Sequence, residues 1–394
     1  MKRIMACFLA LVLAFCTVGA MAAGRENKLV VGSTTALSGN FFSPAFGSNT
    51  SDLDVQTLLH GYHLVKWNGD EGSYVLNDRV VTSLVKTEDS QGNRTYTLTL
   101  CEDLRYSDGT PITARDYAFS ILLNASAQMA EIGGAADGGA CLLGAADYKD
   151  GAKALKGVRV LNDSHLAITV SAEYRPFFYE LGLLDYAPYP ISVIAPGCEV
   201  ADDGSGAYIR NSGATATEPV FTAELLEKTI LDPETGYMSH PSVVSGPYKL
   251  VSFDGQTAQF EINEYYKGNA AGVKPSIEKI TYKTVSNDTM VQQLESGEID
   301  LLNKCVAADT VQKGIQAVSS EDFSMANYAR SGYSFMAFAC EQPTVAEKEV
   351  RQAIAYCFDK DESVKDYVGS YGMRVDGYYG IGQWMVQLLN GTTV

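Results

Sequence analysis

The residues best suited to metal or proton chemistry are the four histidines, and only two of them stand close together. His60 and His63 are three residues apart in a segment with helical apolar spacing, so one helix turn could present both imidazoles on the same side. A tight metal site needs at least a third positioned ligand, and none follows at a recognisable spacing. We therefore interpret these histidines as polar packing residues, and we expect neither a metal nor a cofactor.

The sequence also lacks the local signatures of common enzymes, including the nucleophile elbow, the zinc-protease motif, the phosphate loop and the dinucleotide fingerprint. Asp202-Asp203-Gly204 offers carboxylates, but the spacing of a calcium-binding EF-hand is not met. Carboxylates are abundant, so a glycosidase-type pair stays open from sequence alone. We expect no catalytic residues and no enzymatic activity. The alternative is a secreted hydrolase that acts on peptides or glycans.

Aromatic side chains are the more informative resource, with 23 tyrosines, 15 phenylalanines and 2 tryptophans. Tyrosine-rich loops around a cleft suit the binding of extended polar ligands, because each ring brings apolar area and a polar tip. The alternative for most of these rings is packing in the core or between strands. Clusters occur at Phe41-Phe42, at residues 177–179, at residues 186–189, at Tyr265-Tyr266 and at Tyr378-Tyr379.

The first residues predict export. Lys2 and Arg3 precede an unbroken apolar run over residues 4–15, and small residues follow up to Ala22-Ala23. This order predicts a signal peptide over residues 1–22, with cleavage after Ala22 or Ala23. Two alternatives stay open, an uncleaved anchor of about 20 residues and lipid attachment at Cys16.

The net charge of −17 argues against a nucleic-acid partner, which would need a basic surface. The cysteines beyond the signal are widely spread and include no Cys-x-x-Cys pair, so we interpret most of them as buried thiols, although export permits disulfides. These cysteines are Cys101, Cys141, Cys198, Cys305, Cys340 and Cys357.

The elements that position these residues are predicted strands and helices. A buried-type strand at residues 29–31 leads through a small, polar loop at residues 33–49 to a helix predicted over residues 52–65. Residues 80–88 and 95–100 form a predicted hairpin, and residues 157–161 and 166–170 form another.

Three further patterns predict helices and an α/β unit. Thr113 and Asp116 have the spacing of a capping box at a helix start. Residues 280–302 have the order strand, helix, strand, with the helix N-cap expected at Asn287-Asp288. A helix is predicted over residues 345–358, with its apolar stripe at Val350, Ile354 and Phe358.

Five motifs in a consistent order carry a resemblance to a known family. Together they resemble family 5 of the solute-binding proteins, the oligopeptide- and dipeptide-binding components of ABC importers. One departure is Tyr106, where tryptophan is usual. The motifs are LRYSDGTPITARD at residues 104–116, SGPYKL at 245–250, NEYYKG at 263–268, LESGEID at 294–300 and VRQAIAYCFDK at 350–360.

The resemblance implies an α/β fold with two lobes, of the type II periplasmic-binding-protein class that binds peptides and closes by hinge motion. The first lobe is expected to comprise residues 23–56 and 187–284, with residues 57–186 as a β-rich insert. Residues 285–394 would form the second lobe. Family members continue well past the Val350 helix, so we expect this lobe to be incomplete and the residues that hold peptide termini to lie beyond it.

The implied function is capture of peptides outside the cytoplasm, in the periplasmic space or at the outer face of the cytoplasmic membrane, and delivery to ABC permease subunits. The protein would be a monomer that meets the membrane only through a lipid anchor or the permease. A ligand-sensing receptor domain with the same fold is a further alternative. Candidate ligand contacts lie in the loop after the first strand: Phe41, Phe42, Ser43, Phe46 and Asn49.

Overall fold

The computed structural model describes residues 26–213, 219–320, 322–327, 333–378, 383–389 and 391. The predicted signal peptide, Cys16 and Tyr379 lie outside these residues, so the structure does not test them. In the part of the chain that is described, none of the helices has the length and apolar character that spanning a membrane requires.

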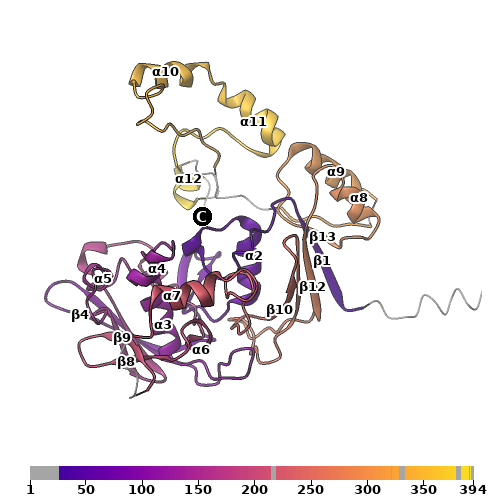
Figure 1. Ribbon diagram of the computed structural model, residues 1–394. Helices are drawn as coiled ribbons and strands as arrows, with labels where there is room; N and C mark the ends of the chain where they lie inside the picture. The colour runs from indigo at the N-terminus through magenta and orange to yellow at the C-terminus, as the bar shows by residue number, and fades with distance from the viewer. Residues whose placement is uncertain are drawn as a thin grey trace, which may run out of the picture.

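A five-stranded mixed sheet forms one side of the molecule (Figure 1). The strand order is β10-β11-β12-β1-β13, and β1 runs parallel to both of its neighbours. The strands are β1 (Lys28–Ser33), β10 (Tyr248–Phe253), β11 (Thr257–Ile262), β12 (Lys279–Thr284) and β13 (Leu301–Leu302).

Two helices cover opposite faces of this sheet. Val30 and Val31 are successive residues of β1, so their side chains point to opposite faces. Val31 belongs to the hydrophobic cluster that includes Val55 of α2 (Thr50–Leu59), whereas Val30 packs on the cluster that includes Met290 of α8 (Met290–Glu295). Figure 1 shows α2 and α8 on the two sides of the sheet.

The predicted strand–helix–strand unit over residues 280–302 is confirmed as β12–α8–β13. Because β13 pairs with β1, the unit completes the sheet that β1 and β12 begin. The prediction of the helix cap at Asn287-Asp288 was wrong. The N-cap is Thr289, and its side chain makes no capping hydrogen bond.

The inserted region folds around a four-stranded antiparallel sheet of order β4-β5-β7-β6. Both predicted hairpins are confirmed, since β4 (Val81–Glu88) pairs with β5 (Arg94–Leu100), and β6 (Val158–Asn162) pairs with β7 (His165–Val170). The helix α3 (Ala114–Asn124) begins with the predicted capping box. It buries nine of its eleven residues, most of them in the largest hydrophobic cluster.

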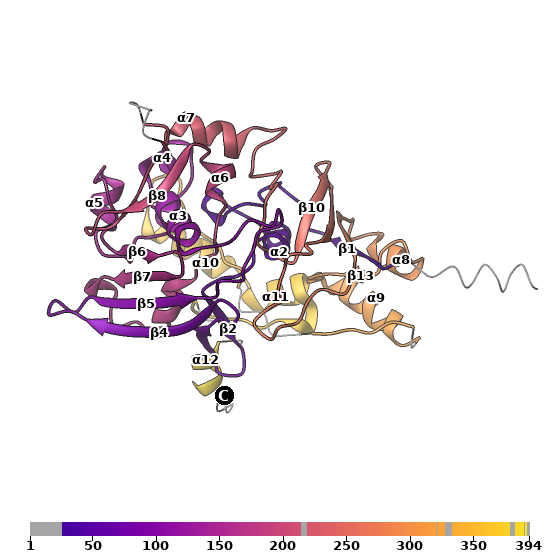
Figure 2. The ribbon, with the colours of Figure 1, turned by 90° about the horizontal axis from the view of Figure 1, so that it is seen from below.

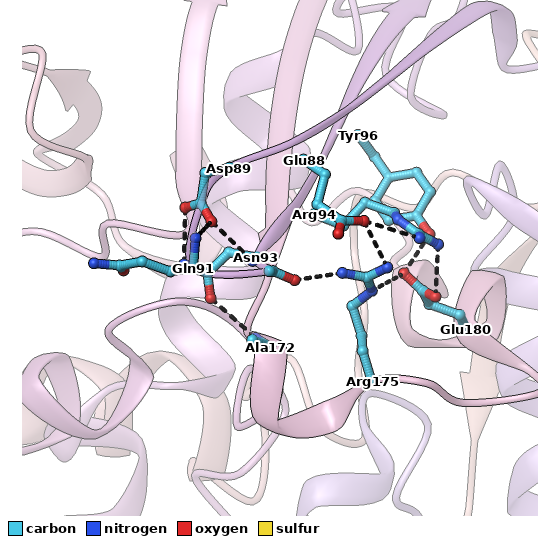
Figure 3. A network of polar contacts seen from close by, with 10 residues as sticks. Glu88, Asp89, Gln91, Asn93, Arg94, Tyr96, Ala172, Arg175 and Glu180 are labelled. Carbon is cyan, nitrogen blue, oxygen red and sulfur yellow. Dashed lines mark hydrogen bonds and ion pairs between the residues drawn. The ribbon is translucent and has the colours of Figure 1, made fainter.

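A polar network fastens the segment after β7 to the β4–β5 hairpin (Figure 3). The Glu180 carboxylate accepts hydrogen bonds from Arg94 Nη1 at 2.9 Å, from the Tyr96 hydroxyl at 2.7 Å and from Arg175 Nε at 3.1 Å. Arg175 Nη2 also pairs with Glu88 at 2.9 Å. Two arginines are thereby held between two carboxylates, which fixes the hairpin against the chain around residue 175.

Shorter elements connect these layers. The short strands are β2 (Val65–Asn68), β3 (Ser73–Leu76), β8 (Cys198–Asp202) and β9 (Ala207–Asn211). The short helices are η1 (Pro44–Phe46), α4 (Ala127–Glu131), α5 (Ala145–Lys149), η2 (Ala172–Tyr174), η3 (Glu180–Leu184), α6 (Ile191–Ile194), α7 (Ala223–Leu226) and η4 (Glu227–Leu231).

The C-terminal helices are packed much less densely. They are α9 (Ala308–Val318), α10 (Lys348–Cys357), α11 (Lys360–Val368), η5 (Gly369–Tyr371) and α12 (Trp384–Leu389). The helix predicted over residues 345–358 is confirmed as α10, but neither α10 nor α11 has a buried residue. Val350 and Phe358 are 40% and 45% exposed. Figure 1 shows α10 and α11 outside both sheets, and in Figure 2, seen from below, they lie behind the sheets.

The cysteines in the described residues are all free thiols. Cys141 and Cys198 are buried, as predicted for most of them, and Cys101 and Cys305 are partly buried. The interpretation as buried thiols was wrong for Cys340 and Cys357, which are exposed. Cys357 ends α10, a helix with no buried residue.

Candidate functional site

The strongest candidate site is the carboxyl edge of the five-stranded sheet. From β12 the chain crosses β1 through α8 and joins the far side of β1 as β13. The connections that follow β1 and β12 therefore leave this edge toward opposite faces of the sheet. Such a switch point leaves a crevice outside the carboxyl ends of the strands, and ligands of open α/β sheets bind there. We call this region the carboxyl edge and define it by residues 33–38, 49–54 and 303–304.

The loop that follows β1 is held in place by the start of α2. The buried carboxylate of Asp52 accepts hydrogen bonds from Ser38 N at 2.9 Å and from Ser38 Oγ at 2.6 Å. Ser51 Oγ donates to Thr35 O at 2.8 Å, and the Ser33 and Ser51 hydroxyls lie 2.9 Å apart. These contacts form a preorganised loop in which Ala36 and Ser38 are exposed.

Two of the predicted ligand contacts, Phe41 and Phe42, are fully buried. Phe41 packs edge-on against Phe253, with ring centroids 4.7 Å apart. Phe42 packs against Tyr189 at 4.8 Å and Tyr237 at 5.2 Å, in the largest hydrophobic cluster. Both side chains thus join neighbouring elements, and contact with a ligand at these positions stays a prediction.

The other three predicted contacts support local structure. Ser43 is buried and caps η1 by accepting a hydrogen bond from Ala45 N at 3.2 Å. Phe46 is half-buried against the insert. Asn49 caps α2, and its Nδ2 donates to Ala36 O at 2.9 Å. Asn49 is the one of the five that contacts the exposed part of the loop.

Sequence reasoning missed a polar cluster at the carboxyl edge, centred on Asp54 of α2. Its carboxylate accepts hydrogen bonds from Asn303 Nδ2 at 2.7 Å and from the Tyr282 hydroxyl at 2.9 Å, and it pairs with Lys304 Nζ at 2.6 Å. One signal was available in the sequence, since Asn303 and Lys304 follow directly after a predicted strand. Their partner lies about 250 residues earlier, so no local pattern identifies it.

The two neighbouring histidines do not share a site. His60 is buried, and its Nε2 lies 2.8 Å from Phe41 O. Burial lowers the pKa of His60 to about 4, which keeps the ring neutral. His63 pairs instead with Asp185, at 2.6 Å. Among the residues that the structure describes, no three His, Cys, Asp or Glu side chains are grouped so that they could hold a metal ion.

A polar cavity of about 340 Å³ lies between α8 and α9. Asn287 and Asp288 line it from the turn before α8, and Lys313 and Gln316 line it from α9. The cavity is open to solvent, and charged side chains of both signs line it.

A family model for bacterial extracellular solute-binding proteins, family 5, matches residues 79–387. The probable D,D-dipeptide-binding periplasmic protein DdpA of Escherichia coli is 24% identical over 383 residues, which are 95% of this chain and 61% of that protein. The chain therefore spans less than two thirds of this relative.

Solved structures share the fold at low sequence identity. Peptide-bound OppA of Listeria monocytogenes is 18% identical, with a TM-score of 0.62 over 90% of this chain and 61% of that one. NikZ of Campylobacter jejuni, in complex with Ni(L-His), is 17% identical, with a TM-score of 0.56 over 90% of this chain and 57% of that one. The two-lobed, periplasmic-binding-protein-like α/β fold predicted from the sequence is confirmed, and the fold alone does not decide the ligand.

Proposed function

The chain belongs to family 5 of the bacterial extracellular solute-binding proteins, and we propose that it captures peptides outside the cytoplasm and delivers them to the permease subunits of an ABC importer. The observation that carries this proposal is the matched family together with the dipeptide-binding relative, which aligns over 95% of the chain. The proteins that it resembles are binding proteins rather than enzymes. Export through the predicted signal peptide, a monomeric state and contact with a permease are parts of the same proposal.

The proposed binding wall on the first lobe is the carboxyl edge. Residues 34–38 offer hydroxyls and backbone groups on a loop that α2 already holds rigid, so binding would cost little ordering. Small side chains there leave room for side chains of the ligand, and waters could fill the remaining space without weakening the contact. Asn49 supports this loop through Ala36, which is the role we propose for it.

We also propose a refined division into lobes. The predicted second lobe began at residue 285, but β13 pairs with β1 and the α8 cluster includes Val30. These contacts support a first lobe that extends to Leu302, with the insert at residues 57–186 attached to it. The connector to the second lobe would then be residues 303–307, between β13 and α9.

The test is to incubate the chain with a defined mixture of peptides and to identify, by native mass spectrometry, what it retains. We expect intact peptides to be bound and none to be consumed. A peptide at about 100 times its dissociation constant should raise the free energy of unfolding by about 2.7 kcal/mol. Peptide fragments in the mixture would favour the secreted hydrolase, and retention of a non-peptide solute alone would contradict the proposed ligand class.

A further inference from the structure

The chain leaves the five-stranded sheet through two residues with unusual constraints. Asn303 N donates the last sheet hydrogen bond, to Gly32 O at 3.0 Å. The next residue, Lys304, has a φ of 57°, in the left-handed region that residues other than glycine rarely adopt. Such a conformation persists only where the surroundings enforce it. The turn at Lys304 sets the direction in which the chain continues to α9.

Asp54 provides that enforcement from the first lobe. The Asp54 carboxylate accepts hydrogen bonds from the side chains of both exit residues, Asn303 Nδ2 at 2.7 Å and Lys304 Nζ at 2.6 Å. It also accepts one from the hydroxyl of Tyr282 on β12, at 2.9 Å. The Asp54 and Lys304 side chains are 24% and 35% exposed, so solvent screens their pairing less than it screens that of a fully exposed pair. Lys304 Nζ also approaches Thr50 O, at 3.4 Å.

The helix that carries Asp54 is itself firmly anchored. Asn49 and Asp52 form a capping box at its start, and Asp52 is buried against the loop after β1. The Tyr282 hydroxyl lies 3.2 Å from Ser51 Oγ, which adds a second link from α2 to β12. Asp54 is therefore a fixed point, and the exit residues are the part that can move.

The geometry points to Asp54 as the anchor of the hinge between the lobes, a positioning residue that sets ligand affinity through Asn303 and Lys304. The inference rests on the proposed function, because a hinge matters when the lobes close on a solute. Asp54 needs no contact with the ligand. It holds the connector at residues 303–307 in the direction that places α9 beside α8. Without the carboxylate the connector samples other directions, and the closed state becomes less populated.

The primary test is hydrogen exchange of the full chain without ligand, comparing the wild type with Asp54→Ala and Asp54→Asn. We expect amides of residues 303–318 to exchange about tenfold faster in Asp54→Ala, since hydrogen bonds to a charged group are lost. Amides of β5 and β7 should not change, which also shows that the variant folds. Asp54→Asn keeps the size of the side chain and one acceptor oxygen, so its exchange rates at residues 303–318 should lie between those of the wild type and of Asp54→Ala.

A matched control is Glu298→Ala, which removes the ion pair between Lys283 and Glu298 at 2.7 Å. This pair joins β12 to the turn before β13 and does not involve the exit residues, so exchange at residues 303–318 should stay unchanged. A double-mutant cycle with Lys304→Ala should be non-additive, because both single changes remove the same pair. Wild-type exchange in Asp54→Ala, or an equal effect of Glu298→Ala, would overturn the inference.

The second readout is affinity for a peptide that the wild type retains, which should fall about tenfold in Asp54→Ala and stay unchanged in Glu298→Ala. Unchanged affinity in Asp54→Ala would contradict a role in positioning the lobes for ligand. If the wild type retains no peptide, the proposed function fails, and the exchange experiment still decides whether Asp54 holds the connector.

Discussion

The helices α3 and α10 have similar lengths, and both were predicted from local sequence patterns, yet they lie in opposite environments. α3 buries nine of its eleven residues, whereas α10 buries none. Tyr356 of α10 is 92% exposed, while Tyr117 of α3 is completely buried. An amphipathic pattern therefore predicts a helix that needs a partner, and it does not say whether the partner is in place.

We expect the largest difference between α3 and α10 in hydrogen exchange. We expect α3 amides to exchange only when the whole insert unfolds and α10 amides to exchange through local opening. The two sets of rates should differ by at least about a thousandfold. Mass spectrometry of exchanged peptides measures both helices in one sample. Equal protection of α10 and α3 would mean that α10 is covered in solution, and the contrast between the two regions would then be wrong.

Substitutions of apolar side chains should affect stability differently in the insert and in α10. Leu98 on β5 is fully buried, and Leu98→Ala should lower the free energy of unfolding by about 3 kcal/mol, because a cavity remains. Val350→Ala on α10 truncates a side chain that is 40% exposed, so it should change the free energy of unfolding by less than about 0.5 kcal/mol. Urea denaturation followed by circular dichroism measures both. A larger loss of unfolding free energy for Val350→Ala would show that this side chain is packed against other residues in solution.

Protonation of the buried His60 should destabilise the folded protein at acid pH. Its pKa in the folded protein is about 4, below the ordinary value of 6.5, so the folded state favours the neutral ring. The resulting stability is fully present above pH 6.5 and is lost as the pH falls toward 4, by about 3 kcal/mol in total.

The measurement is the difference in unfolding free energy between wild type and His60→Gln from pH 7 to pH 4. Other titrating groups largely cancel in this difference, including Asp116, whose pKa burial raises to about 6. The wild type should lose its advantage over the variant as the pH falls. A difference that does not depend on pH would show that His60 is not held neutral.

The smallest expected contrast concerns ion pairs. Glu180→Gln removes a charge held by two arginines and a tyrosine in a largely shielded site, and it should cost about 1–2 kcal/mol. Asp376, near α11, pairs with Lys360 and Arg374 on the open surface. Asp376→Asn should leave the thermal midpoint unchanged. Scanning calorimetry of the two variants compares them directly, and equal shifts would contradict the difference in shielding.

Local patterns predicted local structure well. The spacing of Thr113 and Asp116 predicted a capping box that the structure contains, and the hairpin predicted over residues 80–88 and 95–100 is present as β4 and β5. The helix predicted to reach residue 65 ends at Leu59, because His60 turns inward to the core and the backbone of Tyr62 has a positive φ of 59°. Tertiary contacts decided that end.

The site was harder to predict because it depends on contacts between distant residues. The loop holding Phe41 and Phe42 has no periodicity, so the sequence could not say that both rings point inward. Local patterns predict a boundary between lobes at residue 285, and they cannot detect the pairing of β13 with β1, which joins residues about 270 apart. The Asp54 cluster requires α2, β12 and the exit from β13 to be placed together first.

We predict that a peptide binds at the carboxyl edge of the first-lobe sheet. A retained peptide that carries a photoreactive group tests this directly, with the cross-linked residues identified by mass spectrometry. We predict cross-links to residues 34–38 and to the connector at residues 303–307, and these should be lost when unlabelled peptide is added in excess. Cross-links that unlabelled peptide abolishes but that are confined to the four-stranded sheet of the insert would contradict binding at the carboxyl edge.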